Sequence, residues 1–310
     1  MNVNKTRMET LLAGGVPDVP PTWELGFQIE KAFFGMDPDA VRSATYPSAE
    51  AKERAWWQYR AGVFERLVEE LTWGAVRGGR SPAEIEVTAE LLRGRALIAA
   101  YDDVGVFWMP TGGDIMDFVV RLFEQPAELH QEAREKCDKA KRFFHEAVSA
   151  GADFFMLTYD FGFNNAPFVS PQHFSEFIAP YLAEVVAEIH DLGKRALLHS
   201  DGCLHGILDQ IHATGVDGYH SIDPQGQMDI RAVREAYPDW ILMGNVACNS
   251  LQDVHEDEIR ASVRYCMEHG GIGRRYIFSA SNVIYDGMPV ESYRIMLDEY
   301  KICTERRTGP

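Results

Sequence analysis

The chain has 310 residues, 46% of them hydrophobic, and is therefore long enough to bury one large core, so we expect a single domain over residues 1–310. Its 30 Lys and Arg against 47 Asp and Glu leave a net charge of −17, which excludes nucleic acid and anionic membrane surfaces as favoured partners. No stretch is apolar enough for a signal peptide or a membrane span, and five cysteines without a CxxC pair suggest reduced thiols, so we expect a soluble, cytoplasmic protein.

The first third of the chain has the weaker pattern. Residues 19–27 predict a first strand, and residues 104–110, VGVFWMP, predict another. The charged, tryptophan-bearing segment 50–79 lies between them and is predicted to be helical. No internal repeat and no Gly/Ser linker divides this region from the rest of the chain.

From residue 126 onward, helices and strands alternate. Pro126 opens a helix that ends near Gly151, and an apolar run over 153–160 predicts the next strand. Ser170 is an N-cap for a helix that stops at Gly193. Further strands are predicted at 195–199, 217–220, 240–244 and 275–279, with an amphipathic helix over 259–270. This alternation predicts a parallel sheet, and we expect a (β/α)8 TIM barrel with an N-terminal helical embellishment.

Polar residues follow the predicted strands, where barrels of this class place their reactive groups. In the stretch LLHSDGC, His199 and Asp201 lie at the end of one predicted strand. Side chains alternate between the two faces of an extended chain, so both residues point to the same side. We predict catalytic roles for His199, Asp201 and Asp160. The substrate-binding candidates are Glu24, Tyr159, His220, Asn245 and Asn282. Asn245 is explained equally well as a cap or a partner of loop amides.

Four stretches resemble the uroporphyrinogen decarboxylase superfamily. They are GADFFMLTYDFG (151–162), VSPQHFSEFIAPYLAEVVAEIHDLGKRALLHSDG (169–202), MGNVA (243–247) and FSASNVIYDGMPVESY (278–293). The resemblance extends from about residue 104 to the end of the chain. It implies a barrel enzyme, but the superfamily combines porphyrinogen decarboxylases with methyltransferases that exchange methyl groups with a corrinoid. The resemblance alone therefore leaves both activities open.

Two departures from the decarboxylase pattern argue against that activity. Decarboxylases of the superfamily carry arginines just after the first strand, which clamp the carboxylates of a porphyrinogen. The corresponding residues 20–35, PPTWELGFQIEKAFFG, contain no arginine, and Glu24 would repel a polycarboxylate. Asn282 stands where the decarboxylases have a histidine.

The thiol-specific methyltransferases of the superfamily hold zinc with a His-x-Cys pair and a later cysteine. Here His199 matches the histidine, but Asp201 replaces the first cysteine and Asn282 lies near the position of the second. A thiol acceptor is therefore not expected. Oxygen and imidazole ligands still suit a divalent metal such as zinc, with His199 and Asp201 as first ligands and Glu24 or Asp160 completing the set. Without a metal, Asp160 or His199 would act as general acid.

What remains resembles the methyl-donor side of the corrinoid systems in this superfamily, and this resemblance implies a corrinoid-linked methyltransferase. It would move a methyl group between a small methylated substrate, an ether, alcohol or amine, and a separate corrinoid protein, because the chain has no DxHxxG signature for binding a corrinoid itself. The alternative is a decarboxylase of uroporphyrinogen or of another carboxylated small molecule. A third hypothesis is a barrel that only binds a tetrapyrrole or a partner, and a homodimer is left open.

Overall fold

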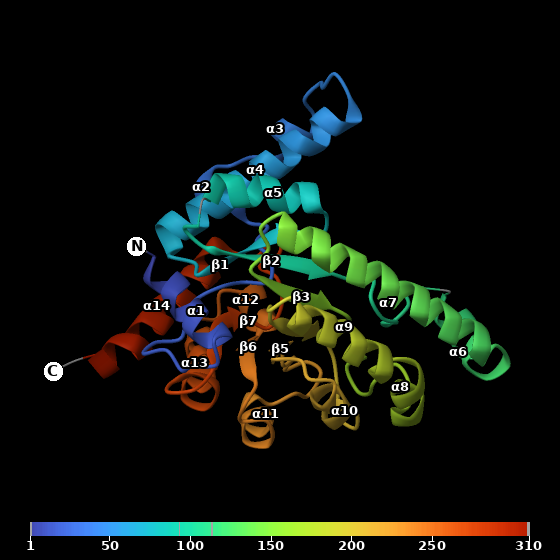
Figure 1. Cartoon of the computed structure of the whole chain (residues 1–310). Helices are drawn as coiled ribbons and strands as arrows, with labels where there is room; N and C mark the ends of the chain where they lie inside the picture. Colours follow the sequence, from blue (N-terminus) through green and yellow to red (C-terminus); the bar gives the residue numbers. More distant parts are fainter. Residues whose placement is uncertain (1, 93, 113, 309–310) are drawn as a thin grey trace.

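The computed structural model describes residues 2–92, 94–112 and 114–308, and Figure 1 shows a curled sheet surrounded by helices. Its strands are β1 (Ala75–Gly79), β2 (Leu97–Asp102), β3 (Phe154–Thr158), β4 (Ala196–Ser200), β5 (Gly218–Ser221), β6 (Ile241–Val246) and β7 (Tyr276–Ala280). The helices that precede β3 are α1 (Val3–Leu12), α2 (Glu30–Phe34), α3 (Pro38–Arg42), α4 (Ala49–Leu71), α5 (Pro82–Leu92), α6 (Asp114–Glu124) and α7 (Pro126–Ser149). Those that follow are α8 (Pro171–Phe177), α9 (Ala179–Asp191), α10 (Leu208–Ala213), α11 (Ile230–Ala236), α12 (Cys248–Gln252), α13 (Glu256–Cys266), the π-helical η1 (Met267–Gly271) and α14 (Val290–Thr308).

The seven strands follow one another in chain order across the sheet, and all of them are parallel. Each crossover carries one or more helices on the outside, as right-handed connections between parallel strands require. The fold is therefore α/β and resembles a TIM barrel. The five strands predicted after residue 150 are confirmed as β3 to β7.

The expected first strand over residues 19–27 does not form a regular ladder. Thr22 makes an isolated parallel bridge with Phe278 of β7, and Phe278 N donates to Pro21 O at 2.9 Å. On the other side, Gly74 N donates to Thr22 O at 3.0 Å, just ahead of β1. Prolines in this segment remove backbone donors, which explains why the pairing is interrupted. In the described residues the sheet has seven strands rather than eight, with this segment between β7 and β1.

Two other sequence predictions were misplaced. The segment 50–79, predicted to be helical throughout, divides into α4 and β1. The strand predicted at 104–110 is a loop, and the strand itself is β2 directly before it. The Asp102 carboxylate accepts a hydrogen bond from Gly105 N at 2.9 Å, which forms a turn and ends the strand early.

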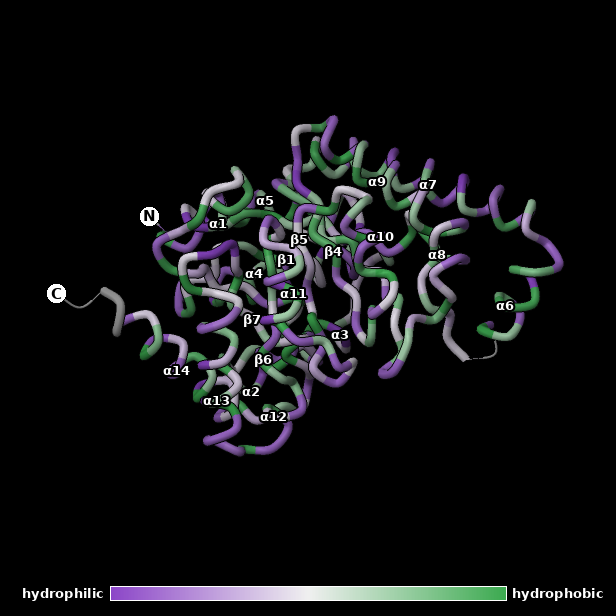
Figure 2. The backbone as a smooth tube through the Cα atoms, turned by 90° about the horizontal axis from the view of Figure 1, so that it is seen from below, coloured by the Kyte–Doolittle hydropathy of each residue, from purple (hydrophilic) through white to green (hydrophobic). Residues whose placement is uncertain are grey.

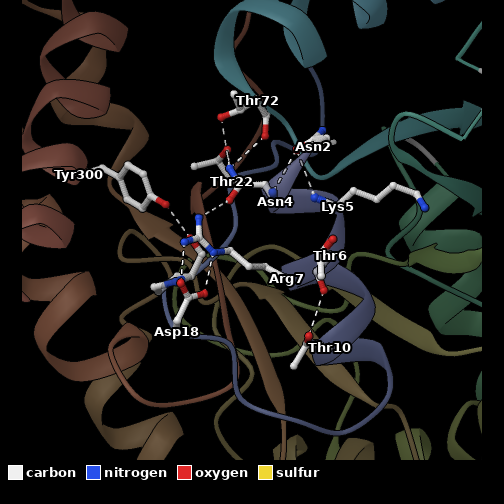
Figure 3. Close-up of polar contacts among 11 residues, drawn as sticks. Asn2, Asn4, Lys5, Thr6, Arg7, Thr10, Asp18, Thr22, Thr72 and Tyr300 are labelled. Atoms are coloured by element: carbon white, nitrogen blue, oxygen red, sulfur yellow. Dashed lines mark hydrogen bonds and ion pairs between the residues drawn. The ribbon is translucent and has the colours of Figure 1, made fainter. Parts of the chain in front are cut away.

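The helix α1 and the loop after it cover the amino-terminal end of the sheet. Figure 3 shows Asn4 and Arg7 holding this helix, with Asn4 Nδ2 donating to Thr72 O at 2.9 Å. A Cβ atom at Gly74 would lie 2.4 Å from Asn4 O, so glycine permits this close approach. Arg195, just before β4, donates to Leu12 O at 2.9 Å. The carboxyl ends of the strands are left for the functional site.

Apolar side chains fill the space between the sheet and its helices. In α9 the side chains of Leu182, Val185, Val186 and Ile189 are buried. Figure 2 shows the hydrophilic colour concentrated on the outer helices and loops. Among the described residues, no helix combines the length and apolar character needed to cross a bilayer.

Candidate active site

Asp160, His199 and Asp201 come together at the carboxyl ends of β3 and β4. His199 Nε2 lies 3.6 Å from Asp160 Oδ1 and 3.8 Å from Asp201 Oδ2. One potential ligand atom from each residue lies within 4.8 Å of the others. The structure therefore assembles the three residues that the sequence assigned to catalysis.

Strand alternation and a tight loop contact explain this arrangement. His199 and Asp201 flank Ser200, whose Oγ turns away and accepts a hydrogen bond from Phe161 N at 2.9 Å. Asp201 N donates to Asp160 Oδ1 at 3.0 Å, which ties the two strand ends together. Gly202 has a φ of 80°, and a Cβ atom there would lie 2.2 Å from the carbonyl oxygen of the preceding strand's loop, so only glycine fits.

A cavity of about 530 Å³ opens beside this cluster, and we call it the acidic cavity. Its lining residues are Met109, Asp160, Gly162, Phe163, Asn164, Asp201, Gly202, Asp223, Gln225, Cys248, Ser281 and Asn282. Three of them are aspartates, and none of the described lining residues is a lysine or an arginine. His199, 6% exposed, lies against the cavity through its contacts with the two aspartates. The potential of such a cavity favours a cation.

Asp201 is a partly buried carboxylate beside the other two members of the cluster. Burial raises the pKa of Asp201 above its usual value, an effect that His199 opposes and Asp160 adds to. Asn282 Nδ2 donates to Asp201 Oδ2 and Asn282 also lines the acidic cavity, while its contact with substrate stays a prediction. Asp201 Oδ1 is buried, and a hydrogen bond from the Ser221 side chain also opposes the rise in the pKa of Asp201.

His220 lies behind His199 and outside the lining of the acidic cavity. Its Nδ1 is 2.8 Å from His199 Nδ1, and its Nε2 is 3.2 Å from Ala280 O. Burial lowers the pKa of His220 well below its usual value, and the neighbouring His199 adds to that shift. His220 is therefore neutral at ordinary pH.

Glu24 is fully enclosed by the protein. Its Oε2 accepts hydrogen bonds from Ser279 Oγ at 2.8 Å and from Ala280 N at 2.9 Å. Burial raises the pKa of Glu24 to about 8 despite these two donors. It is absent from the three-residue cluster of potential metal ligands found in the described chain.

Tyr159 and Asn245 also turn their polar atoms into the protein. The Tyr159 hydroxyl donates to the Asp102 carboxylate, and Asn245 Nδ2 donates to Ile222 O. Neither residue lines the acidic cavity. Substrate contact by either of them, or by Glu24 and His220, stays a prediction.

Two further groups line the acidic cavity: Cys248, which the sequence reasoning missed, and Asp223, whose place after a strand is explained equally well as a cap or a partner of loop amides. Cys248 begins α12 just after β6, and its backbone N–H donates to Ser281 Oγ at 3.3 Å. Burial raises the pKa of the Cys248 thiol to about 11, so the thiol stays protonated. Asp223 follows β5 and accepts hydrogen bonds from Gly202 N at 3.2 Å and Gln225 N at 2.9 Å. The position of Cys248 after a strand was the one signal that could have identified it.

Solved structures with a similar fold include one close superposition over the whole chain. A methyltransferase from Methanosarcina mazei has a TM-score of 0.76 at 15% identity and covers 96% of this chain and 98% of its own. A D-psicose 3-epimerase from Clostridium cellulolyticum H10 has a TM-score of 0.47 at 9% identity, covering 81% of this chain and 92% of its own. At 15% identity the first likeness shows a shared fold.

Comparison with curated proteins finds no match. The family model for uroporphyrinogen decarboxylase (URO-D), in contrast, matches residues 107–302, more than half of the 310 residues. The matched span contains β3 to β7 and the whole cluster of Asp160, His199 and Asp201. The methyltransferase fold agrees with a superfamily that includes both activities. The chain belongs to the uroporphyrinogen decarboxylase family.

Proposed function

We propose that this protein is a methyltransferase that moves a methyl group from a small ether, alcohol or amine to the cobalt of a corrinoid carried by a separate protein. It would act as one domain over residues 1–310, in the cytoplasm. The observation that carries this proposal is the acidic cavity: three aspartates and an adjacent histidine surround a space that no described lysine or arginine lines. The likeness in fold to a methyltransferase supports the same conclusion.

The alternative, a decarboxylase, fits this cavity poorly. A carboxylated substrate is normally held by charge-assisted hydrogen bonds, each contributing about 1.5–3 kcal/mol. In the acidic cavity such a substrate would meet Asp160, Asp201 and Asp223 instead. The negative charges of the substrate and of the aspartates would repel each other, and most strongly for a porphyrinogen with many carboxylates.

The cluster fits a divalent metal such as zinc. One imidazole nitrogen and two carboxylate oxygens form a donor set that suits zinc and harder divalent ions. His199 Nε2 lies 3.6 Å from Asp160 Oδ1 and 3.8 Å from Asp201 Oδ2, so one donor atom of each residue lies close to the others. Asp160, His199 and Asp201 would hold the ion, which when bound supplies Lewis acidity toward a substrate oxygen.

The chain's own residues orient the cluster and receive the substrate. Asn282 fixes one oxygen of Asp201, while Asp160 accepts the Asp201 backbone N–H. The volume of about 530 Å³ is within the range of small-molecule sites. In the reaction the methyl–oxygen bond of an ether breaks, cob(I)alamin contributes both electrons of the new methyl–cobalt bond, and the leaving oxygen takes up a proton. Asp160 is partly exposed to the cavity, and without a bound ion it is placed to deliver that proton.

A spectroscopic assay tests this proposal. The purified protein is incubated anaerobically with zinc, free cob(I)alamin and a panel of methyl ethers, methyl alcohols and methylamines, and methylcobalamin formation is followed by absorbance. We expect protein-dependent methylation with at least one class of donor. Uroporphyrinogen is offered in a parallel reaction analysed by chromatography. Accumulation of coproporphyrinogen would instead establish the decarboxylase, and no turnover in either reaction would favour a binding protein.

A further inference from the structure

His199 and His220 occupy paired positions on neighbouring strands. The register of β4 and β5 sets His199 opposite His220, so both side chains lie on the same face of the sheet. Their Nδ1 atoms are 2.8 Å apart, a hydrogen-bond distance. Two nitrogen atoms at this distance share one proton, because two lone pairs or two N–H groups facing each other would repel.

The far side of His220 determines which ring donates that proton. His220 Nε2 lies 3.2 Å from Ala280 O, a carbonyl oxygen that can only accept, so Nε2 carries a proton. A second proton on Nδ1 would make His220 a cation. Its side chain is 0% exposed, and it contacts a carbonyl oxygen and another imidazole, neither of which compensates a buried positive charge. The proton between the rings therefore belongs to His199 Nδ1.

We propose that His220 is a positioning residue that holds His199 as the Nδ1–H tautomer, with the lone pair of His199 Nε2 directed at Asp160 and Asp201. In this tautomer the neutral His199 has no proton at Nε2 to donate. His199 is thus a ligand or base rather than the general acid that the sequence left open. The tautomer follows from hydrogen bonding alone, whereas its use in metal binding rests on the proposed function.

The distances around His199 Nε2 agree with this role. Asp160 Oδ1 and Asp201 Oδ2 lie 3.6 and 3.8 Å away, within ion-pair distance but beyond ordinary hydrogen-bond distance, so Nε2 faces both carboxylates while Nδ1 faces His220. A hydrogen bond that fixes the tautomer of a ligating histidine commonly raises metal affinity by about 10–100-fold. Loss of the acceptor at position 220 should therefore weaken metal binding without touching a ligand.

Nitrogen NMR reads the tautomer directly in the wild-type protein without added metal. Two-bond proton–nitrogen correlations of the 15N-histidine-labelled full chain distinguish Nδ1–H from Nε2–H rings. The His199 and His220 signals are assigned by their disappearance in His199→Asn and His220→Asn. We expect a protonated Nδ1 in His199 and a protonated Nε2 in His220 at neutral pH. A neutral Nε2–H tautomer or an imidazolium at His199 would overturn the proposal.

Metal titration of two variants distinguishes the loss of the hydrogen-bond acceptor at position 220 from the loss of the histidine ring. In His220→Asn the amide oxygen can replace Nδ1 as acceptor, whereas His220→Phe keeps a ring but removes the acceptor. Zinc affinity is measured by competition with a chelator, and cobalt(II) absorption reports the ligand geometry. We expect zinc affinity to fall by about 10–100-fold in His220→Phe and by less than about threefold in His220→Asn. Wild-type affinity and an unchanged cobalt spectrum in folded His220→Phe would contradict the positioning role.

The two experiments also separate this inference from the proposed function. If the wild type binds neither zinc nor cobalt(II) but shows the expected tautomers, the metal hypothesis fails and the role of His220 in setting the tautomer is supported. If the wild type binds metal and His199 carries its proton on Nε2, the metal hypothesis stands and the role of His220 is wrong. Should His220→Phe not fold, the wild-type NMR measurement still decides the tautomer.

Discussion

Two cavities of this protein differ in the charges of the residues that line them. The acidic cavity places three aspartates at the ends of β3, β4 and β5 with one histidine beside them. The second, which we call the arginine cavity, measures about 690 Å³ between β1 and the N-terminal helices. Its charged lining residues are Glu30, Lys31, Asp39, Arg42, Arg60, Arg77, Glu84 and Asp286. One cavity therefore concentrates a single sign of charge, while the other mixes both.

The arginine cavity pairs half of its charged lining residues with one another. Arg60 Nη1 lies 2.9 Å from the Glu30 carboxylate, and Arg42 Nη1 lies 3.4 Å from that of Asp39. Arg77 stacks its guanidinium over the Tyr101 ring, 4.7 Å from its centroid. In the acidic cavity Asp160 and Asp201 share one buried histidine, His199. Charge that the protein does not balance indicates where a ligand of opposite charge is needed, and that is the acidic cavity.

The largest expected effect comes from the same substitution made in each cavity. Asp201→Asn removes one negative charge from the acidic cavity and a proposed metal ligand, and we expect methyl transfer to cobalamin to fall on the order of 1000-fold. Asp286→Asn removes the same charge from the arginine cavity, where Asp286 is exposed. We expect its rate to stay within about twofold of the wild type. Initial rates under saturating cob(I)alamin measure both.

His199→Ala also removes a proposed metal ligand from the acidic cavity. Its melting temperature is measured alongside its methyl-transfer rate, so that lost activity can be distinguished from lost stability. A functional role predicts lost activity with a melting temperature near that of the wild type. A purely structural role predicts the reverse, because an unpaired buried partner costs about 1–3 kcal/mol of the free energy of unfolding. Full activity in well-folded His199→Ala would remove this residue from the site.

A smaller effect, on the pH dependence of the free energy of unfolding, is expected for Glu24, a carboxylate that lies in neither cavity. Glu24 has a usual pKa of 4.5 when unfolded and about 8 in the folded protein. Between these values the folded state binds the extra proton, so stability is complete below about 4.5 and decreases by about 1.4 kcal/mol per pH unit as pH rises toward 8. Glu24→Gln should remove this contribution, measured as the free energy of urea unfolding against pH. An unchanged slope would mean that Glu24 ionises normally.

The smallest expected effect concerns Arg77, the cation of the arginine cavity that stacks on Tyr101. We expect Arg77→Gln to change zinc affinity and the methyl-transfer rate by less than about threefold, because no charge of the acidic cavity depends on it. A loss comparable to that in Asp201→Asn would show that the two cavities form one site. Such a result would also support the alternative hypothesis, in which the substrate carries carboxylates.

The later strands and the cluster were predictable for one physical reason. Fully buried parallel strands are continuous apolar runs, and their ends at one edge are marked by polar residues and glycine, as in LLHSDG. The position of Asp160 beside His199 followed from that rule. β1 escaped prediction because its sequence AVRGG is short, carries an arginine and follows α4 almost directly.

The partners inside the site required the structure. His199 meets His220 only because β4 and β5 pair in a particular register, which no local pattern encodes. Glu24 follows a strand-like segment as expected, but its hydrogen bonds to Ser279 and Ala280 depend on how that segment lies along β7. Residues that follow strands can thus be collected from the sequence, whereas the direction of each side chain depends on long-range pairing.

Metal stoichiometry tests the central claim most directly. The metal-free wild type, Asp201→Asn and Asp286→Asn are titrated with zinc, and bound metal is counted after buffer exchange. The account predicts one tightly bound zinc per chain in the wild type and in Asp286→Asn, and affinity at least about 100-fold weaker in Asp201→Asn. Equal zinc binding by all three proteins, or none by the wild type, would contradict the claim that the acidic cavity is built around a cation.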